Sequence, residues 1–153
     1  MPVKPYNGGY FEIVADPSGA QLKLVAQADG RIICQAGAVH GRHRAWLFHH
    51  APGHEGYWLV RTAADIRTPP PANIHLTNID GGHNPVRVEQ AHHDSENQHW
   101  SFAAHGEVLR IRCRKDSNYR LQAVAGAGAH LVLDADPVPP LADWHLRETK
   151  PDD

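Results

Sequence analysis

The feature of this sequence that most constrains its fold is the recurrence of tryptophan in similar surroundings. Trp46, Trp100 and Trp144 each stand near the start of a short apolar run, at offsets of 54 and 44 residues. An alternating apolar pair precedes each tryptophan by 11 or 12 residues: Ile32-x-Cys34, Val86-x-Val88 and Leu131-x-Leu133. Self-similarity at this period indicates one structural unit copied three times, whose copies bury a shared core.

The rest of the chain is typical of short strands. No stretch of a dozen residues shows helical periodicity, whereas short runs of alternating character recur between Gly, Pro, Asn and Asp. Twelve such runs are predicted as strands: Tyr10–Val14, Gln21–Val25, Arg31–Gln35, Ala45–His49, Tyr57–Arg61, Ile74–Ile79, Val86–Gln90, His99–Ala103, Val108–Arg112, Arg120–Val124, His130–Asp134 and Asp143–Arg147.

Twelve strands in three units predict an all-β chain with the β-trefoil fold, which has pseudo-threefold symmetry. Six strands are expected to form a short barrel, and six to form hairpins that cap it. We expect one domain, residues 1–153, with four-stranded repeats at approximately 6–53, 54–104 and 105–149. A chain of this length is one domain's worth of sequence.

In this fold each repeated tryptophan is expected in the core, where the fourth strand of its unit meets the cap. The aromatic residues that open strands, Tyr10, Tyr57 and Trp58, are expected to face the core as well.

Composition excludes several classes of function. Fifteen Lys and Arg against 17 Asp and Glu give a formal charge of −2, which lacks the basic footprint of a duplex nucleic-acid binder. No apolar run approaches the roughly 18–20 residues that a membrane-spanning helix needs, so we expect no membrane insertion. The first ten residues lack the apolar core of a secretory signal. Only two cysteines are present, Cys34 and Cys113, which we expect to be buried and reduced in a cytoplasmic protein.

Asn97-Gln98-His99-Trp100 resembles the Asn-Gln-x-Trp signature of ricin-B-type lectins. At the position of Gln98 the other two units carry Arg44 and Ala142, so the motif is confined to the second unit. Ala91-His92-His93, which precedes it, is similar to the Gly-His-His segment of the small fungal ricin-B-like lectins. The resemblance implies a protein that binds a galactose-type glycan without catalysis.

In those lectins the galactoside site uses an Asp with a Gly three residues on, then a His, then the Asn of the Asn-Gln pair. The resemblance carries the last role to Asn97, and His92 or His93 takes the histidine role. Asn78 with Gly81 keeps the three-residue step but puts Asn where the family has Asp. The site implied by the resemblance has six residues, with Asp80 close enough to supply the carboxylate: Asn78, Asp80, Gly81, His92, His93 and Asn97.

Such residue types suit a sugar, because vicinal hydroxyls both donate and accept hydrogen bonds, and amide and carboxylate groups can form the complementary bonds. The same strings also fit an ordinary hairpin and a solvated polar loop. Val39–His43 in unit one could form a second site, whereas Pro137–Leu141 in unit three lacks polar groups and is expected to bind no sugar. A weak single site would need further sites or a homodimer for avidity.

Two alternatives remain open. The long insertion Ala63–Asn73, stiffened by three prolines, could be presented to a protease or another protein, with Arg67 as the primary contact. The 13 histidines could also make binding depend on pH, because their full protonation moves the formal charge from −2 to −2 + 13 = +11.

No cofactor or catalytic motif is found, and we expect neither an enzyme nor a cofactor. The histidine spacings His40-x-x-His43 and His49-His50 with His54 lack cysteine partners in a motif, so no metal site is expected.

Overall fold

The structure is a computed structural model that describes most of the chain. The described residues are 2–15, 21–27, 31–37, 39, 41–64, 74–78, 86–90, 96–115, 117–123, 131–134 and 141–152, with 74, 86–90 and 131–134 described by their backbone alone.

All twelve expected strands are present, each within one or two residues of its predicted bounds. They are β1 (Tyr10–Ala15), β2 (Leu22–Ala26), β3 (Ile32–Gln35), β4 (Trp46–His50), β5 (Trp58–Thr62), β6 (Ile74–Asn78), β7 (Val86–Gln90), β8 (Trp100–His105), β9 (Val108–Cys113), β10 (Arg120–Ala123), β11 (Leu131–Asp134) and β12 (Trp144–Glu148). Two short 3₁₀ turns, η1 (Arg42–Arg44) and η2 (Glu96–Gln98), precede β4 and β8 and were not predicted.

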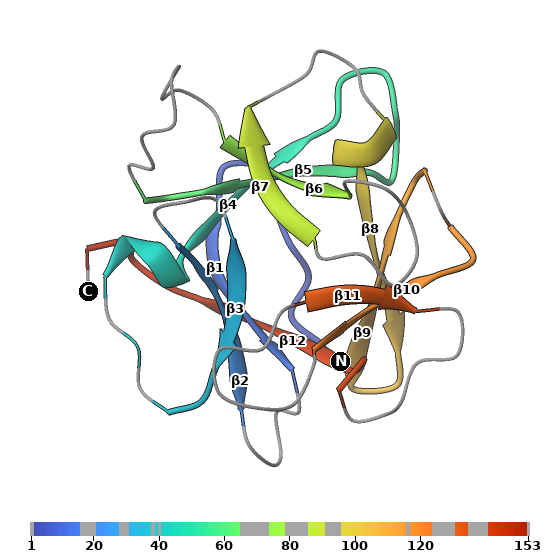
Figure 1. The fold of residues 1–153 in the computed structure, drawn as a ribbon. Coiled ribbons are helices and arrows are strands. Elements are labelled where there is room, and N and C mark those ends of the chain that lie inside the picture. The colour runs from blue at the N-terminus through green and yellow to red at the C-terminus, as the bar shows by residue number, and fades with distance from the viewer. Residues whose placement is uncertain are drawn as a thin grey trace.

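Six strands close into a barrel. Antiparallel pairing runs from β1 to β4, β5, β8, β9 and β12, and β12 pairs with β1 again. The other six strands form the hairpins β2–β3, β6–β7 and β10–β11. Their second strands β3, β7 and β11 lie next to one another around the centre of the view in Figure 1. A six-stranded barrel capped by three hairpins is the β-trefoil, as predicted.

The three repeated tryptophans hold equivalent places in this fold. The indole N–H of Trp46 donates to the carbonyl of Leu24 at 3.2 Å. Trp100 donates to Leu76 at 2.9 Å, and Trp144 donates to Leu121 at 2.8 Å. All three indoles are fully buried. Each one therefore joins the fourth strand of its unit to the first strand of the capping hairpin, which confirms the expected role.

Strand register defines the equivalent positions on the first strand of each unit. Phe11 lies opposite Trp46, Trp58 opposite Trp100, and Leu109 opposite Trp144. The glycine that precedes the strand is Gly9 or Gly56 in the first two units, two residues before the equivalent position. In the third unit the glycine is Gly106, three residues before Leu109. An alignment of the three units by these glycines would therefore shift the first strand of the third unit by one residue.

The barrel interior follows from alternation along the strands. In β9 the residues Leu109, Ile111 and Cys113 are buried, and those between them are partly exposed. Phe48 of β4 packs edge-to-face on Phe102 of β8, with ring centroids 5.1 Å apart. Such aromatic pairs add to the stabilisation that comes from burial of apolar area.

The expectation for the strand-opening aromatics is met in part. Tyr10, Tyr57 and Trp58 are partly buried, and Trp58 packs against the core, with its indole edge-to-face on the buried ring of Phe48 at a centroid distance of 6.1 Å. Cys34 and Cys113 are buried free thiols, as expected. Among the described residues, no helix is long and apolar enough to span a bilayer.

Candidate functional site

Two of the six predicted glycan-site residues lie in the described part of the chain. Asn78 ends β6 and is 2% exposed, whereas Asn97 is partly exposed in η2. β6 and η2 are neighbours in the fold. The other four, Asp80, Gly81, His92 and His93, lie outside the described residues.

A buried hydrogen bond ties the two described segments together. The side-chain amide of Gln98 donates to the hydroxyl of Thr77 at 3.1 Å. Gln98 is 1% exposed and Thr77 is fully buried. Since Gln98 follows Asn97 and Thr77 precedes Asn78, this bond holds the end of β6 beside the turn that carries Asn97.

The other two units carry different residues at the position of Gln98, and these residues make different contacts. Arg44 in unit one is also buried, and its guanidinium donates to the carbonyl of Lys150 at 3.2 Å. It also lies 4.0 Å from the carboxylate of Glu12. Ala142 in unit three is fully buried, and its methyl group has no polar atom that could form a hydrogen bond. Unit two is therefore the unit in which this position links the 3₁₀ turn to the hairpin through a side-chain amide.

The turn η2 is also held from the side of β9. A guanidinium nitrogen of Arg114 lies 3.2 Å from Nδ1 of His99, which is 1% exposed. Because a guanidinium can only donate, Nδ1 of His99 is the acceptor. The same Arg114 lies 3.7 Å from the carboxylate of Glu96, and the thiol of Cys113 donates to the Glu96 carbonyl at 3.5 Å.

The connection between β4 and β5 packs on this anchor. The ring of His54 lies 4.8 Å from that of His99, and the ring of Tyr57 lies 6.5 Å from it. The guanidinium of Arg114 sits 5.9 Å above the Tyr57 ring. One side of this connection is therefore fixed to the unit that carries Asn97.

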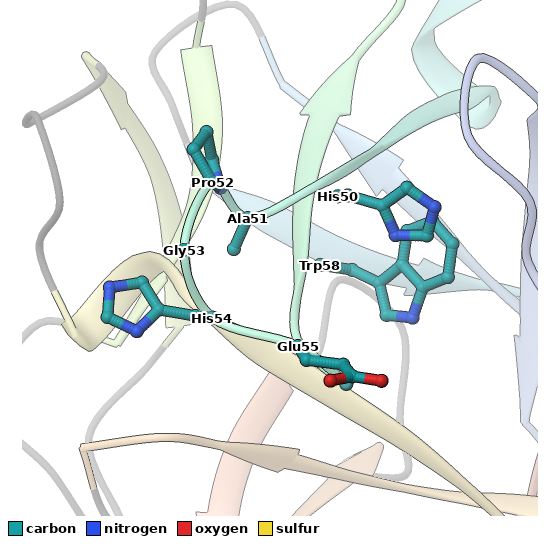
Figure 2. Close-up of a pocket in the computed structure, with 8 residues that line it drawn as sticks. His50, Ala51, Pro52, Gly53, His54, Glu55 and Trp58 are labelled. Atoms are coloured by element: carbon teal, nitrogen blue, oxygen red, sulfur yellow. The ribbon is translucent and has the colours of Figure 1, made fainter.

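The other side of the connection lines an open depression of about 530 Å³. Figure 2 shows His50 lying over Trp58, with Glu55 below the indole in this view and His54 directed to the other side of the turn, and all four residues line the depression. The imidazole of His50 stacks on Trp58, with ring centroids 4.3 Å apart and planes 29° from parallel. Sequence reasoning missed this depression, because it assigned Trp58 to the core alone, whereas Trp58 packs against the core and also lines the depression. Two glycines, Gly53 and Gly56, between the predicted strands were the available signal of a long turn.

The remaining predicted features are described only in part. In unit one, Nδ1 of His43 lies 2.7 Å from the carbonyl of Ala26, so this ring makes a contact within the protein. Of the insertion Ala63–Asn73, all but the first two residues lie outside the described part of the chain, Arg67 included. In the ranges that the structure describes, no three His, Cys, Asp or Glu side chains gather in a way that could hold a metal.

Comparison with known proteins shows a shared fold. No family model matches the chain, and no curated protein matches its sequence. Among solved structures, the BEL β-trefoil is 14% identical with a TM-score of 0.74, covering 97% of this chain and 98% of its own. The Macrolepiota procera ricin B-like lectin, solved in complex with lactose, is 15% identical with a TM-score of 0.68, covering 96% and 100%.

The fold also occurs as part of a larger protein. The GlcNAcα1-4Gal-releasing endo-β-galactosidase of Clostridium perfringens is 12% identical with a TM-score of 0.71, covering 93% of this chain. This chain spans 33% of that enzyme's length. At such identities the comparisons establish the β-trefoil fold.

Proposed function

We propose that this chain binds a galactose-type glycan without transforming it, through a site in its second unit. The observation that carries the proposal is the hydrogen bond from Gln98 to Thr77, which seats Asn97 beside the end of the β6 strand. The resemblance of this segment to ricin-B-type lectins supports it. The common fold with a lectin solved in complex with lactose supports it too.

The burial of the two asparagines divides their roles. Asn97 is partly exposed, so its amide can both donate to and accept from sugar hydroxyls. Asn78 is 2% exposed, and we assign it the positioning of the segment that follows β6. In this proposal Asp80 supplies the carboxylate, Gly81 permits close approach of the sugar, and His92 or His93 completes the site.

The first test is a glycan array probed with the native chain and with Asn97→Ala. The native chain should bind galactose-terminated glycans, and the variant should lose about tenfold or more in apparent affinity, because two hydrogen bonds are removed. Asn118→Ala is the matched control, since Asn118 is an exposed turn asparagine between β9 and β10. It should bind as the native chain does.

An array on which the native chain binds nothing contradicts the proposed function. An unchanged signal from Asn97→Ala contradicts the placement of the site. Thermal unfolding of each variant shows whether a loss of signal reflects binding or folding.

A further inference from the structure

We propose that the depression at the connection between β4 and β5 is a second sugar-binding site, which takes a neutral pyranose. The ring would stack against the paired rings of Trp58 and His50 and donate hydroxyl hydrogen bonds to Glu55. The inference extends the proposed glycan-binding function, yet it stands on residues separate from those of the unit-two site.

The fold itself does not require this depression. β8 and β9, which occupy the equivalent place one unit later, are joined by Gly106 and Glu107 alone. Between β4 and β5 the connection runs over residues 51–57. A trefoil barrel can therefore close here with a two-residue turn, and the longer connection is a local addition to the repeat.

The longer connection is internally braced. The amide of Ala51 donates to the carbonyl of Tyr57 at 3.0 Å, and the amide of His54 donates to Ala51 at 3.1 Å. The amide of Tyr57 then donates to His54 at 3.2 Å. Gly53 and Gly56 adopt φ values of 75° and 85°, which residues with a side chain rarely adopt. A turn built in this way is ready for a ligand before the ligand arrives, which reduces the ordering cost of binding.

The aromatic surface of the depression is unusual in this molecule. Of the four tryptophans in the chain, the other three are fully buried, and Trp58 is the one that is partly exposed. It lies directly opposite His50 across the β4–β5 ladder and stacks on that imidazole, while its indole also packs edge-to-face on the core ring of Phe48. A pyranose presents C–H groups on one face of its ring, and that face is the part of a sugar that fits a flat aromatic surface.

A carboxylate at the edge of this surface can bind the hydroxyl groups around a sugar ring. Glu55 is exposed at the edge of the depression, and its carboxylate can accept from two neighbouring hydroxyls through charge-assisted bonds. The remaining lining comes mostly from small and apolar residues, including Ala51 and Pro52. A volume of about 530 Å³ falls within the range of small-molecule sites.

A quaternary ammonium ion is the competing ligand, because such a cation also binds over an aromatic face. It carries no hydroxyl that could donate to the Glu55 carboxylate, so the experiment includes tetramethylammonium beside the sugars.

The test uses Trp58 as its own reporter. Acrylamide quenching of tryptophan fluorescence should report mainly on Trp58, because the three buried indoles are shielded. Galactose, glucose, mannose and N-acetylglucosamine are each titrated to about 100 mM, since single sugar sites bind in the millimolar range. We expect at least one to lower the quenching constant by about half, because a pocket buries most of the surface of a small ligand, and a sugar bound there would stand between acrylamide and the exposed part of Trp58.

Variants that keep the reporter identify the site. Glu55→Gln should raise the half-saturating sugar concentration roughly tenfold by removing a charge-assisted acceptor. Glu107→Gln is the matched control, because Glu107 is the exposed glutamate of the equivalent β8–β9 turn. It should leave the titration unchanged, and glycerol at matched viscosity should give no protection.

The inference is overturned if no sugar protects Trp58, if protection persists unchanged in Glu55→Gln, or if tetramethylammonium protects better than every sugar. The Asn97→Ala variant separates this inference from the proposed function, because protection should survive in it. Loss of protection there would assign the signal to unit two and overturn the second site. If a sugar protects Trp58 from quenching but the native chain binds nothing on the glycan array, the site at the β4–β5 connection is supported and the unit-two site is contradicted.

Discussion

At the scale of single residues, the four tryptophans of this chain fall into two kinds. Trp46, Trp100 and Trp144 are buried donors to a backbone carbonyl of the capping hairpin. Trp58 is partly exposed and stacks on a neighbouring side chain. The difference predicts different consequences for the same conservative substitution.

Trp100→Phe should lower the free energy of unfolding by about 2–4 kcal/mol, because it leaves a cavity and a buried carbonyl without its donor. Trp58→Phe should cost less than about 1 kcal/mol, since a partly exposed site tolerates a smaller ring. Urea denaturation followed by far-UV circular dichroism measures both. Equal losses in the two variants would show that the buried indole hydrogen bond has no special weight.

At the scale of elements, the turn η2 is positioned by contacts from two directions. Gln98 reaches Thr77 on β6, and Arg114 at the end of β9 reaches His99 and Glu96. A three-residue turn has little stability of its own, because it closes at most one or two backbone hydrogen bonds. Its geometry therefore depends on these side chains, and so does the placement of Asn97.

Gln98→Ala should weaken glycan binding although Gln98 is itself 1% exposed and out of reach of a ligand. It should also destabilise the fold by about 1–3 kcal/mol, because partners of a buried amide lose a hydrogen bond. Gln35→Ala, at an exposed glutamine at the end of β3, is the control and should change neither quantity. Calorimetric titration with lactose and urea denaturation measure the two effects, and intact lactose binding would show that η2 does not position the site.

At the scale of the whole molecule, the β4–β5 connection is in contact with the segment that carries Asn97. His54 of the β4–β5 connection packs on His99, which adjoins the turn of Asn97. Two sites in one chain would raise avidity for a glycan that presents several sugars, without any increase in the affinity of either site. A homodimer would multiply this effect and remains part of the proposal.

The histidine content makes a separate prediction at this scale. Formal charge moves from −2 to +11 if all 13 histidines are protonated. Retention on sulfated agarose should therefore rise steeply between about pH 7.5 and pH 5, and about 0.5 M salt should abolish it. A flat pH profile would remove the idea that the histidines control an interaction with an anionic surface.

Much of the fold was predictable because its signals repeat locally. Alternation of apolar and polar residues encodes which face of a strand is buried, so β7 was predicted to the residue and the other strands nearly so. The spacing of the tryptophans encoded the three units. The two 3₁₀ turns were missed, since three residues are too few to show a period.

The candidate sites were less predictable, because their contacts join residues that are distant in sequence. The sequence alone determined the strands and the threefold plan, and it carried the resemblance of the segment around Asn97 to ricin-B-type lectins. Only the tertiary structure decided that Gln98 would contact Thr77, that His54 would pack on His99, and that Trp58 would be partly exposed and stack on His50. Local patterning specifies whether a side chain is buried, but barrel closure brings separate strands together and thereby chooses its neighbours.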